Sequence, residues 1–317
     1  MRKFSRRQLC ILALTTTPGV GTATINLLLS RSDERNTSLA ECIDELRTEG
    51  KARPSIPSSA HRRITQMGDP IARGKRVVHN LRHSEVKPLF VDDELYPARI
   101  SAHLDGPPPP VLFLRGNEQL LGRNTVGIVG SRKPSAPSRH AAVTFAEALA
   151  TAGTVVVSGG ARGIDSAGHT GGLRGRGTII IPATGVLRFQ WKHIDKPRHA
   201  GWCILGHFPP GDRWRTRNAL QRNHSIVALS DAVVGFEPRN SGGTWRSCHS
   251  AIKQRKPLFI VNSRTDKEYL QAQEHFVREG AMALDPHNMP GHEDFFAMVR
   301  NYSPPPASSQ SELFGSR

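Results

Sequence analysis

The chain has 317 residues, with 43 lysines and arginines against 27 aspartates and glutamates, so its formal charge is +16. Hydrophobic residues make up 37% of it and 29 residues are glycine, a composition typical of folded proteins, which excludes disorder throughout. The positive excess favours an extended polyanion such as nucleic acid as the partner, although a merely soluble basic surface would give the same counts. No stretch comes near the roughly 20 apolar residues of a membrane helix.

The N-terminus predicts two helices within residues 7–30, joined by a tight turn from Thr17 to Gly21. Gly19 and Gly21 allow the turn, and the backbone amides that begin the second helix can face a DNA phosphate. This is a helix-hairpin-helix pattern, and an ordinary helical hairpin explains it equally well. A further short helix over Leu39–Leu46 completes a predicted small helical domain over residues 1–50.

The same N-terminus contains Arg6 and Arg7 before a short apolar run, as in a twin-arginine export signal. Pro18 interrupts that run and no cleavage site follows, so we do not expect export. The four cysteines are widely spaced, form no Cys-x-x-Cys pair and predict neither a zinc site nor a disulfide framework, which is typical of a cytoplasmic protein.

Residues 51–84 are rich in arginine, proline and serine with weak periodicity, and we interpret them as a basic linker. From residue 85 to about 300, short apolar runs alternate with helical patterns. This alternation predicts a Rossmann-like, doubly wound α/β domain with a mainly parallel sheet. The proline- and serine-rich residues 301–317 are expected to be a disordered tail. Strands are expected at 126–129, 154–157, 178–181, 203–205, 232–236 and 258–261, and helices at 142–150, 165–174, 218–230 and 245–255.

Three loops follow predicted strands, where such sheets bind ligands. The first, Gly130–Ser135, contains a glycine that lets the backbone turn, serines and amides for phosphate oxygens, and the forked donor Arg132. It matches neither a dinucleotide nor a Walker motif, so no cofactor is expected. The candidate phosphate-binding residues of this loop are Gly130, Ser131, Arg132 and Ser135.

The second loop runs from Ser158 to Asp165, and its candidate residues are Ser158, Gly159, Arg162 and Gly163. Asp165 is expected either to cap the helix that follows or to hold Arg162. His169, one turn later, is expected to be a packed helix residue more than a catalyst.

The third loop follows the strand predicted at 232–236 and offers Ser241, Gly242, Gly243 and Thr244 before a helix. Residues 186–224, between the second and third loops, combine eight lysines and arginines with five aromatic residues. This combination suits a single strand whose phosphates pair with cations and whose bases stack, although a solvated basic edge with core aromatics would look similar. Candidate contacts in this segment are Arg217, Arg222 and Asn223.

Together these residues resemble the DprA/Smf family of DNA-processing proteins, which load recombinase onto incoming single-stranded DNA in bacteria. The resemblance extends from Asp92 to Val261. It rests on Tyr96-Pro97, Leu112–Gly116, Gly127–Arg132, Ser158–Asp165 with His169, Phe208–Gly211, Arg222-Asn223 before Ser230–Ala232, and Ser241-Gly242.

The resemblance implies that Gly130, Ser131 and Arg132 contact DNA together with Arg222 and Asn223. It also implies a homodimer that protects the strand and hands it to RecA during DNA uptake and recombination. Two departures stand out. Family members commonly carry an aromatic residue where this chain has Ala219-Leu220, and the segment Gly243–Arg246 differs from theirs. We also expect no C-terminal winged-helix module after about residue 300.

Two other functions remain open. A hydrolase of the lysine-decarboxylase-like (LOG) family would cleave nucleoside monophosphates at a loop like Ser241–Thr244, but Trp245–Cys248 supplies no carboxylate for that chemistry. A Rossmann-like nucleotide sensor would use the same loops for one small phosphate compound, without needing so large an excess of positive charge. No metal motif, nucleophile elbow or carboxylate group suggests catalysis, so we predict a DNA-binding protein that is not an enzyme.

Overall fold

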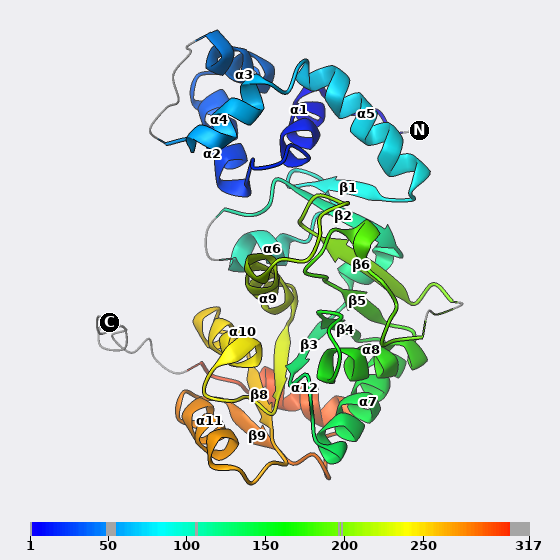
Figure 1. Cartoon of the computed structure of the whole chain (residues 1–317). Coiled ribbons are helices and arrows are strands. Elements are labelled where there is room, and N and C mark those ends of the chain that lie inside the picture. The colour runs from blue at the N-terminus through cyan, green and yellow to red at the C-terminus, as the bar shows by residue number, and fades with distance from the viewer. Residues whose placement is uncertain (1, 49–54, 105–106, 196, 198, 305–317) are drawn as a thin grey trace. The chain divides into compact units, whose positions relative to one another are not determined.

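The computed structural model describes residues 2–48, 55–104, 107–195, 197 and 199–304. Nine strands within these residues form a mainly parallel sheet in the order β1-β2-β6-β5-β4-β3-β7-β8-β9, preceded by a helical region (Figure 1). The predicted α/β fold is therefore confirmed. The chain divides into two compact units, unit 1 over 1–118, 182–190 and 203–219, and unit 2 over 119–181, 191–202 and 220–317. The predicted tail lies outside the described residues from 305 on.

Unit 2 contains the doubly wound part of the fold. Its strands are β3 (Thr125–Gly130), β4 (Val155–Ser158), β5 (Thr178–Ile180), β7 (Ala232–Phe236), β8 (Leu258–Val261) and β9 (Met282–Leu284), all paired in parallel. The chain winds outward from β3 through β4 to β5, then returns beside β3 and winds the other way through β7, β8 and β9. The strand order therefore reverses between β3 and β7, which is where sheets of this kind bind ligands.

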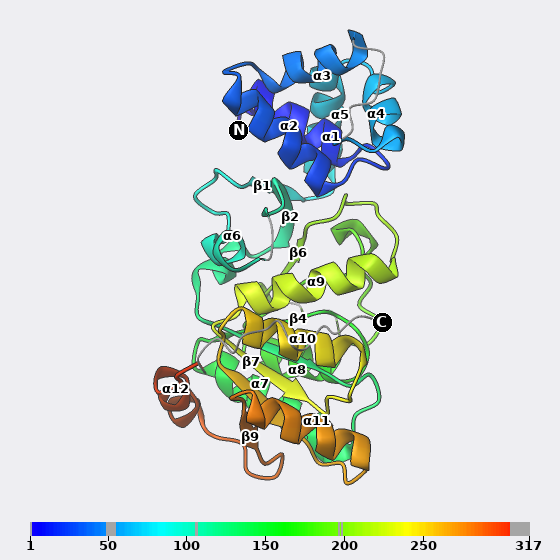
Figure 2. The same ribbon diagram turned by 90° about the vertical axis from the view of Figure 1, so that its left-hand side faces the viewer.

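Helices cover both faces of these strands. On one side α7 (Ala136–Thr151) packs along α8 (Ile164–Arg174), and on the other lie α10 (Gly242–Lys253) and α11 (Lys267–Arg278) (Figures 1 and 2). The ring of Phe295, from α12 (His292–Arg300), contacts Phe145 and Phe259 at centroid distances of 5.1 and 4.7 Å in the core. Helix α9 (Thr216–Leu229) buries Ile226–Leu229 and begins in the part of the chain assigned to unit 1.

Unit 1 contains the antiparallel strands. Strand β2 (Val111–Gly116) pairs with β1 (Lys87–Phe90) and with β6 (Trp202–Gly206), and both pairings are antiparallel. The short helix α6 (Ala98–His103) and the 3-10 turns η1 (Glu118–Gly122) and η2 (Val186–Arg188) complete the elements around these strands.

The N-terminal helices confirm the predicted hairpin. They are α1 (Arg6–Thr15), which begins with a capping box between Ser5 and Gln8, α2 (Thr22–Glu34) and α3 (Leu39–Thr48). Gly19 adopts a φ of +84° in the turn, and Gly21 precedes α2 in extended conformation. No helix in the described part of the chain is long and apolar enough to cross a membrane.

Residues 58–83 differ from the linker that their composition suggests, because they form α4 (Ser58–Thr65) and α5 (Pro70–His83). Asp69 caps α5 and Pro70 stands in its first turn, where proline is compatible with a helix. Gly74 lets α5 lie directly against the backbone of Leu9. The arginines that suggested a linker belong to helices that bury Ala60, Ile64, Val78 and Leu81.

Candidate nucleic-acid interface

The three predicted loops meet at one edge of the unit 2 sheet. Strands β4, β3 and β7 are neighbours and run parallel, so the loops that follow Ser158, Gly130 and Phe236 all leave the same edge. The structure therefore brings together the candidate residues of all three loops. Arg217 lies in unit 1, as do Gly19 and Gly21, so those three are described separately.

The first and second loops are joined through their backbones. The amide of Ile164, at the start of α8, donates to the carbonyl of Ser131 over 3.1 Å. Gly163 before it has a φ of +88°, and a Cβ there would overlap the backbone of Ser131 and Arg132. A Cβ at Gly130 would lie 2.7 Å from the Ile164 side chain. Glycine is thus required at both positions, because the two loops touch where a side chain would stand.

The buried side chain of Arg222 supports the second loop. It lies 3.7 Å from the carboxylate of Asp165, which also accepts a hydrogen bond from the amide of Ala161. A Cβ at Gly159 would overlap the guanidinium of Arg222. Burial raises the pKa of Asp165, and the positive charge of Arg222 opposes that rise. The partner of Asp165 is therefore Arg222 and not the expected Arg162, which is exposed.

Asn223 plays a corresponding part for the third loop. Its side-chain amide donates to the carbonyl of Gly243 over 3.4 Å, so α9 is connected to the start of α10. Arg222 and Asn223 are adjacent in sequence, and each supports a different loop. Both residues therefore affect the candidate interface indirectly, by holding two of its loops in position.

The groups left open to solvent are cationic side chains and helix N-termini. Arg132 and Arg162 are exposed, as are Ser241, Gly242 and Gly243. Helix α10 begins without a side-chain cap and has no acidic residue in its first turn, whereas the first turn of α8 contains Asp165 and the amide of Ile164 is already bonded to Ser131. Uncapped amides at the N-terminus of α10, at the same sheet edge as exposed arginines, favour a bound anion. Ser158 is buried and donates to Ile128, and Thr244 is half-buried.

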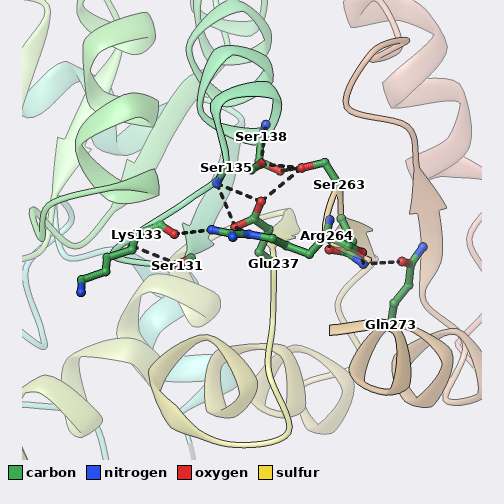
Figure 3. A network of polar contacts seen from close by, with 9 residues as sticks. Ser131, Lys133, Ser135, Ser138, Glu237, Ser263, Arg264 and Gln273 are labelled. Carbon is green, nitrogen blue, oxygen red and sulfur yellow. Dashed lines mark hydrogen bonds and ion pairs between the residues drawn. The ribbon is translucent and has the colours of Figure 1, made fainter. Parts of the chain in front are cut away.

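Ser135 differs from the other candidates because its groups are already occupied (Figure 3). Its amide donates to the carboxylate of Glu237 over 3.1 and 3.2 Å, its hydroxyl caps α7 by accepting from the amide of Ser138, and it also contacts the hydroxyl of Ser263. A carboxylate thus stands at the N-terminus of α7, where the sequence suggested a phosphate. We therefore do not expect Ser135 to contact an anion directly.

Glu237 is the functional residue that sequence reasoning missed. Its carboxylate is fully enclosed and accepts hydrogen bonds from Ser263 and from Arg264 over 3.2 and 3.3 Å. Arg264 also donates to the carbonyl of Lys133 over 2.9 Å, which ties the first loop to the segment after β8 (Figure 3). A single acid after a strand gives no sequence pattern, and its partners are up to 102 positions away.

His169 is a packed helix residue, as predicted, and it is fully buried. The hydroxyl of Thr178 donates to the carbonyl of Val156, so it accepts from Nδ1–H of His169 over 2.8 Å. This arrangement leaves Nε2 unprotonated, and that atom has no hydrogen-bond partner among the described residues.

Acidification from pH 7 to pH 5 is expected to lower the free energy of unfolding by roughly 2 kcal/mol through His169. Burial, with a smaller effect of Arg222, lowers the pKa of His169 to about 3. An unfolded imidazole takes up its proton near pH 6.5, so the unfolded state binds more protons below that value and stability falls as the pH falls toward 3. Urea unfolding of wild type and His169→Gln at both pH values measures the effect. Equal acid sensitivity of the two proteins would contradict it.

The basic and aromatic segment lies mostly in unit 1, where its aromatic residues differ in exposure. Phe208 is buried, whereas 54% of Trp214 is exposed, the largest fraction among the exposed large hydrophobic residues. Arg213, Arg215 and Arg217 beside it are all exposed. Trp214 is therefore the aromatic side chain in this segment best placed to stack with a base. Among the described residues no group of three histidines, cysteines or acids could hold a metal ion.

Comparison with known proteins relates this chain to DNA-processing proteins. The sequence profile of the DNA recombination-mediator protein A family matches residues 87–290. The chain is 26% identical over 218 residues to DNA processing protein DprA of Bacillus subtilis, covering 66% of this chain and 71% of that protein. The structure of DNA processing protein A from Streptococcus pneumoniae has the same fold, with a TM-score of 0.72 at 23% identity over 93% of this chain and 98% of the other.

A second solved structure concerns the single-stranded DNA binding mode of DNA processing protein A from Helicobacter pylori. It is 26% identical with a TM-score of 0.57, over 69% of this chain and 98% of that one. The profile covers well over half of the sequence and includes all three loops and the buried Arg222–Asp165 pair. The chain therefore belongs to the DNA recombination-mediator protein A family, also known as DprA or Smf.

Proposed function

We propose that this chain binds single-stranded DNA at the three loops of unit 2 and, as a homodimer, protects the strand and assists RecA loading during DNA uptake and recombination. The observation that carries the proposal is the presence of exposed Arg132 and Arg162 at the same sheet edge as the uncapped N-terminus of α10. Such groups bind phosphates without reading sequence. The binding mode described for the Helicobacter pylori relative supports a single strand as the ligand.

The family is one of recombination mediators and not of known enzymes. For the hydrolase alternative, the carboxylate that directly precedes the third loop would be Glu237. Its side chain is enclosed and its oxygens are engaged by Ser135, Ser263 and Arg264, so it is not placed to assist attack on a ribose. The nucleotide-sensor alternative gives no reason for a charge of +16, whereas every phosphate on a strand can pair with a cation.

The homodimer and the transfer to RecA are inferred from family membership. One surface in unit 2 suits a second copy. Leu270 and Val277 lie seven positions apart on α11, on one face of the helix, with 42% and 43% of their surfaces exposed. Covering these side chains in a dimer would remove apolar area from water.

The direct test compares binding of labelled oligo-dT with binding of a duplex of equal length across a salt series. We expect the single strand to bind at least about tenfold more tightly, with an affinity that falls steeply as salt rises because counterions are released. Equal affinity for duplex, or no salt dependence, would overturn the proposal.

Trp214 lies in unit 1, outside the three loops, and we further propose that it stacks with a base of the bound strand. Trp214→Ala is then expected to weaken strand binding by about 1–3 kcal/mol, because stacking of one base on an aromatic ring contributes that much. The salt dependence should stay unchanged, since no charge is removed. Arg213→Ala, at the adjacent exposed position, should instead reduce the salt slope. Titrations of both variants and of Trp214→Phe, which retains a ring, provide the comparison. A Trp214→Ala protein with wild-type affinity would exclude the stacking role.

A further inference from the structure

Unit 1 contains a cavity of about 390 Å³ that has no part in the proposed strand-binding loops. One wall is a face of α5, and the opposite wall is formed by Leu187, Pro210 and Gly211. Its size falls in the range of sites for small molecules, which is roughly 300–1,000 Å³. Its α5 wall belongs to the segment over 51–84 whose composition suggested only a linker.

The α5 wall is cationic. Arg73 and Arg76 lie three positions apart on this helix and both line the cavity, and no acidic residue does. Arg73 donates through Nη2 to the carbonyl of Thr16 over 3.2 Å. Its Nε is buried and has no hydrogen-bond partner among the described residues. A guanidinium fixed at one end, which lines the cavity beside a second arginine, is suited to an anionic group.

The opposite wall is apolar and firmly held. The amide of Leu187 donates to the carbonyl of Pro210 over 3.0 Å, and that of Gly185 donates to Asp212 over 2.9 Å. A Cβ at Gly185 would overlap the carbonyls of Pro209 and Pro210, so the two segments lie in direct backbone contact. Leu187 is nevertheless 41% exposed. A rigid wall with an incompletely covered leucine is a surface on which a flat ring can pack.

Asn80 adds a polar group to the same helical face, two turns beyond Arg73. Its side-chain amide offers both a donor and an acceptor, as the edge of a nucleobase does. The cavity therefore combines cations for a phosphate, an apolar wall for a ring and an amide for the polar edge of that ring. Val77 and Leu81 supply further apolar surface from α5.

We propose that this cavity binds a nucleotide, with its phosphate at Arg73 and Arg76 and its base between the α5 face and Leu187. The site is separate from the three loops of unit 2 and gives the helical region a ligand of its own. The nucleotide can be free in solution or can be the 5′-phosphorylated end of a DNA strand, because both present the same chemical groups.

Calorimetric titration of the full chain with thymidine 5′-monophosphate and with thymidine tests the site. We expect the monophosphate to bind at least about tenfold more tightly than the nucleoside, and Arg76→Ala to remove most of that difference. Lys75→Ala is the matched control. Lys75 is the exposed neighbour of Arg76 on α5 and does not line the cavity. This variant should remain within about twofold of wild type, because charge away from the cavity contributes only through screened long-range attraction.

Oligo-dT with and without a 5′-phosphate separates the two sources. If the ligand is a strand end, wild type prefers the phosphorylated strand and Arg76→Ala loses the preference. If the ligand is a free nucleotide, Arg76→Ala weakens binding of the monophosphate and leaves binding of both oligonucleotides unchanged.

Leu187→Trp, which fills the cavity without changing charge, should block whichever ligand binds. Binding of oligo-dT without a 5′-phosphate measures the three loops of unit 2 on their own, so failure of the strand-binding proposal is recognised separately. The nucleotide site would be overturned if Arg76→Ala and Lys75→Ala bound the monophosphate with equal affinity and also bound the 5′-phosphorylated strand with equal affinity.

Discussion

Arg222→Met is expected to lower the free energy of unfolding by about 3–5 kcal/mol, the usual result of removing one partner from a buried ion pair. The substitution removes the buried cation beside Asp165 and leaves the amide of Ala161 as a hydrogen-bond donor and the weaker effect of Arg132. It also removes the support beneath Gly159, so the second loop should lose its shape and strand binding should weaken. Urea unfolding at pH 7, with strand binding measured on the folded fraction, gives both quantities.

The control for this prediction is a double-mutant cycle with Asp165→Asn, which keeps an acceptor for Ala161. The double variant should lose less stability than the sum of the two single variants, because it contains no unpaired buried charge. Burial raises the pKa of Asp165, so lowering the pH should protonate it in Arg222→Met and reduce the difference in stability between that variant and the double variant. Additive losses would mean that Arg222 and Asp165 do not act as a pair.

Gly163→Ala is expected to destabilise the fold by about 1–3 kcal/mol from backbone strain, with an added cost from overlap. Gly163 has a φ of +88° and a ψ of −127°, a conformation open essentially to glycine alone, and its Cβ position is occupied by the backbone of Ser131 and Arg132. The two loops would have to separate. Strand binding should therefore fall even in conditions where the protein stays folded.

Gly122→Ala is the matched substitution, because a Cβ at Gly122 meets no atom within 4 Å and its φ is not positive. Thermal unfolding should show Gly122→Ala at or slightly above wild-type stability, since alanine reduces the entropy of the unfolded chain. A Gly163→Ala protein with wild-type unfolding and binding would show that the first and second loops are not packed as described.

Much of unit 2 could be predicted because its central strands are continuous apolar runs. Residues 126–129, 232–236 and 258–261 all lie in buried parallel strands. Strand β9 escaped prediction because its apolar run is only three residues long, although Met282 and Leu284 pack partly against the core. Strands β1 and β2 were not recognised as an antiparallel pair, since such pairing depends on contacts far apart in the chain.

The sequence predicted which loops follow strands and form the candidate site. It did not predict the roles of individual side chains within those loops. Arg132 and Arg162 are exposed, as a phosphate contact requires. Arg222 carries the same charge, but its pairing with Asp165 across 57 positions makes it a buried support. No local pattern distinguishes these arginines. The expectation for Ser135 changes for a related reason, since the carboxylate that occupies its amide comes from Glu237 at the end of another strand.

The central claim is that the first loop holds the phosphates of a single strand, and Arg132→Ala tests it most directly. Fluorescence anisotropy of labelled oligo-dT across a salt series should show about tenfold or greater loss of affinity and a shallower salt slope for this variant. Arg300→Ala, which removes an exposed charge at the end of α12, should bind nearly as wild type. Equal losses in the two variants, or no loss in Arg132→Ala, would contradict a phosphate site at this loop.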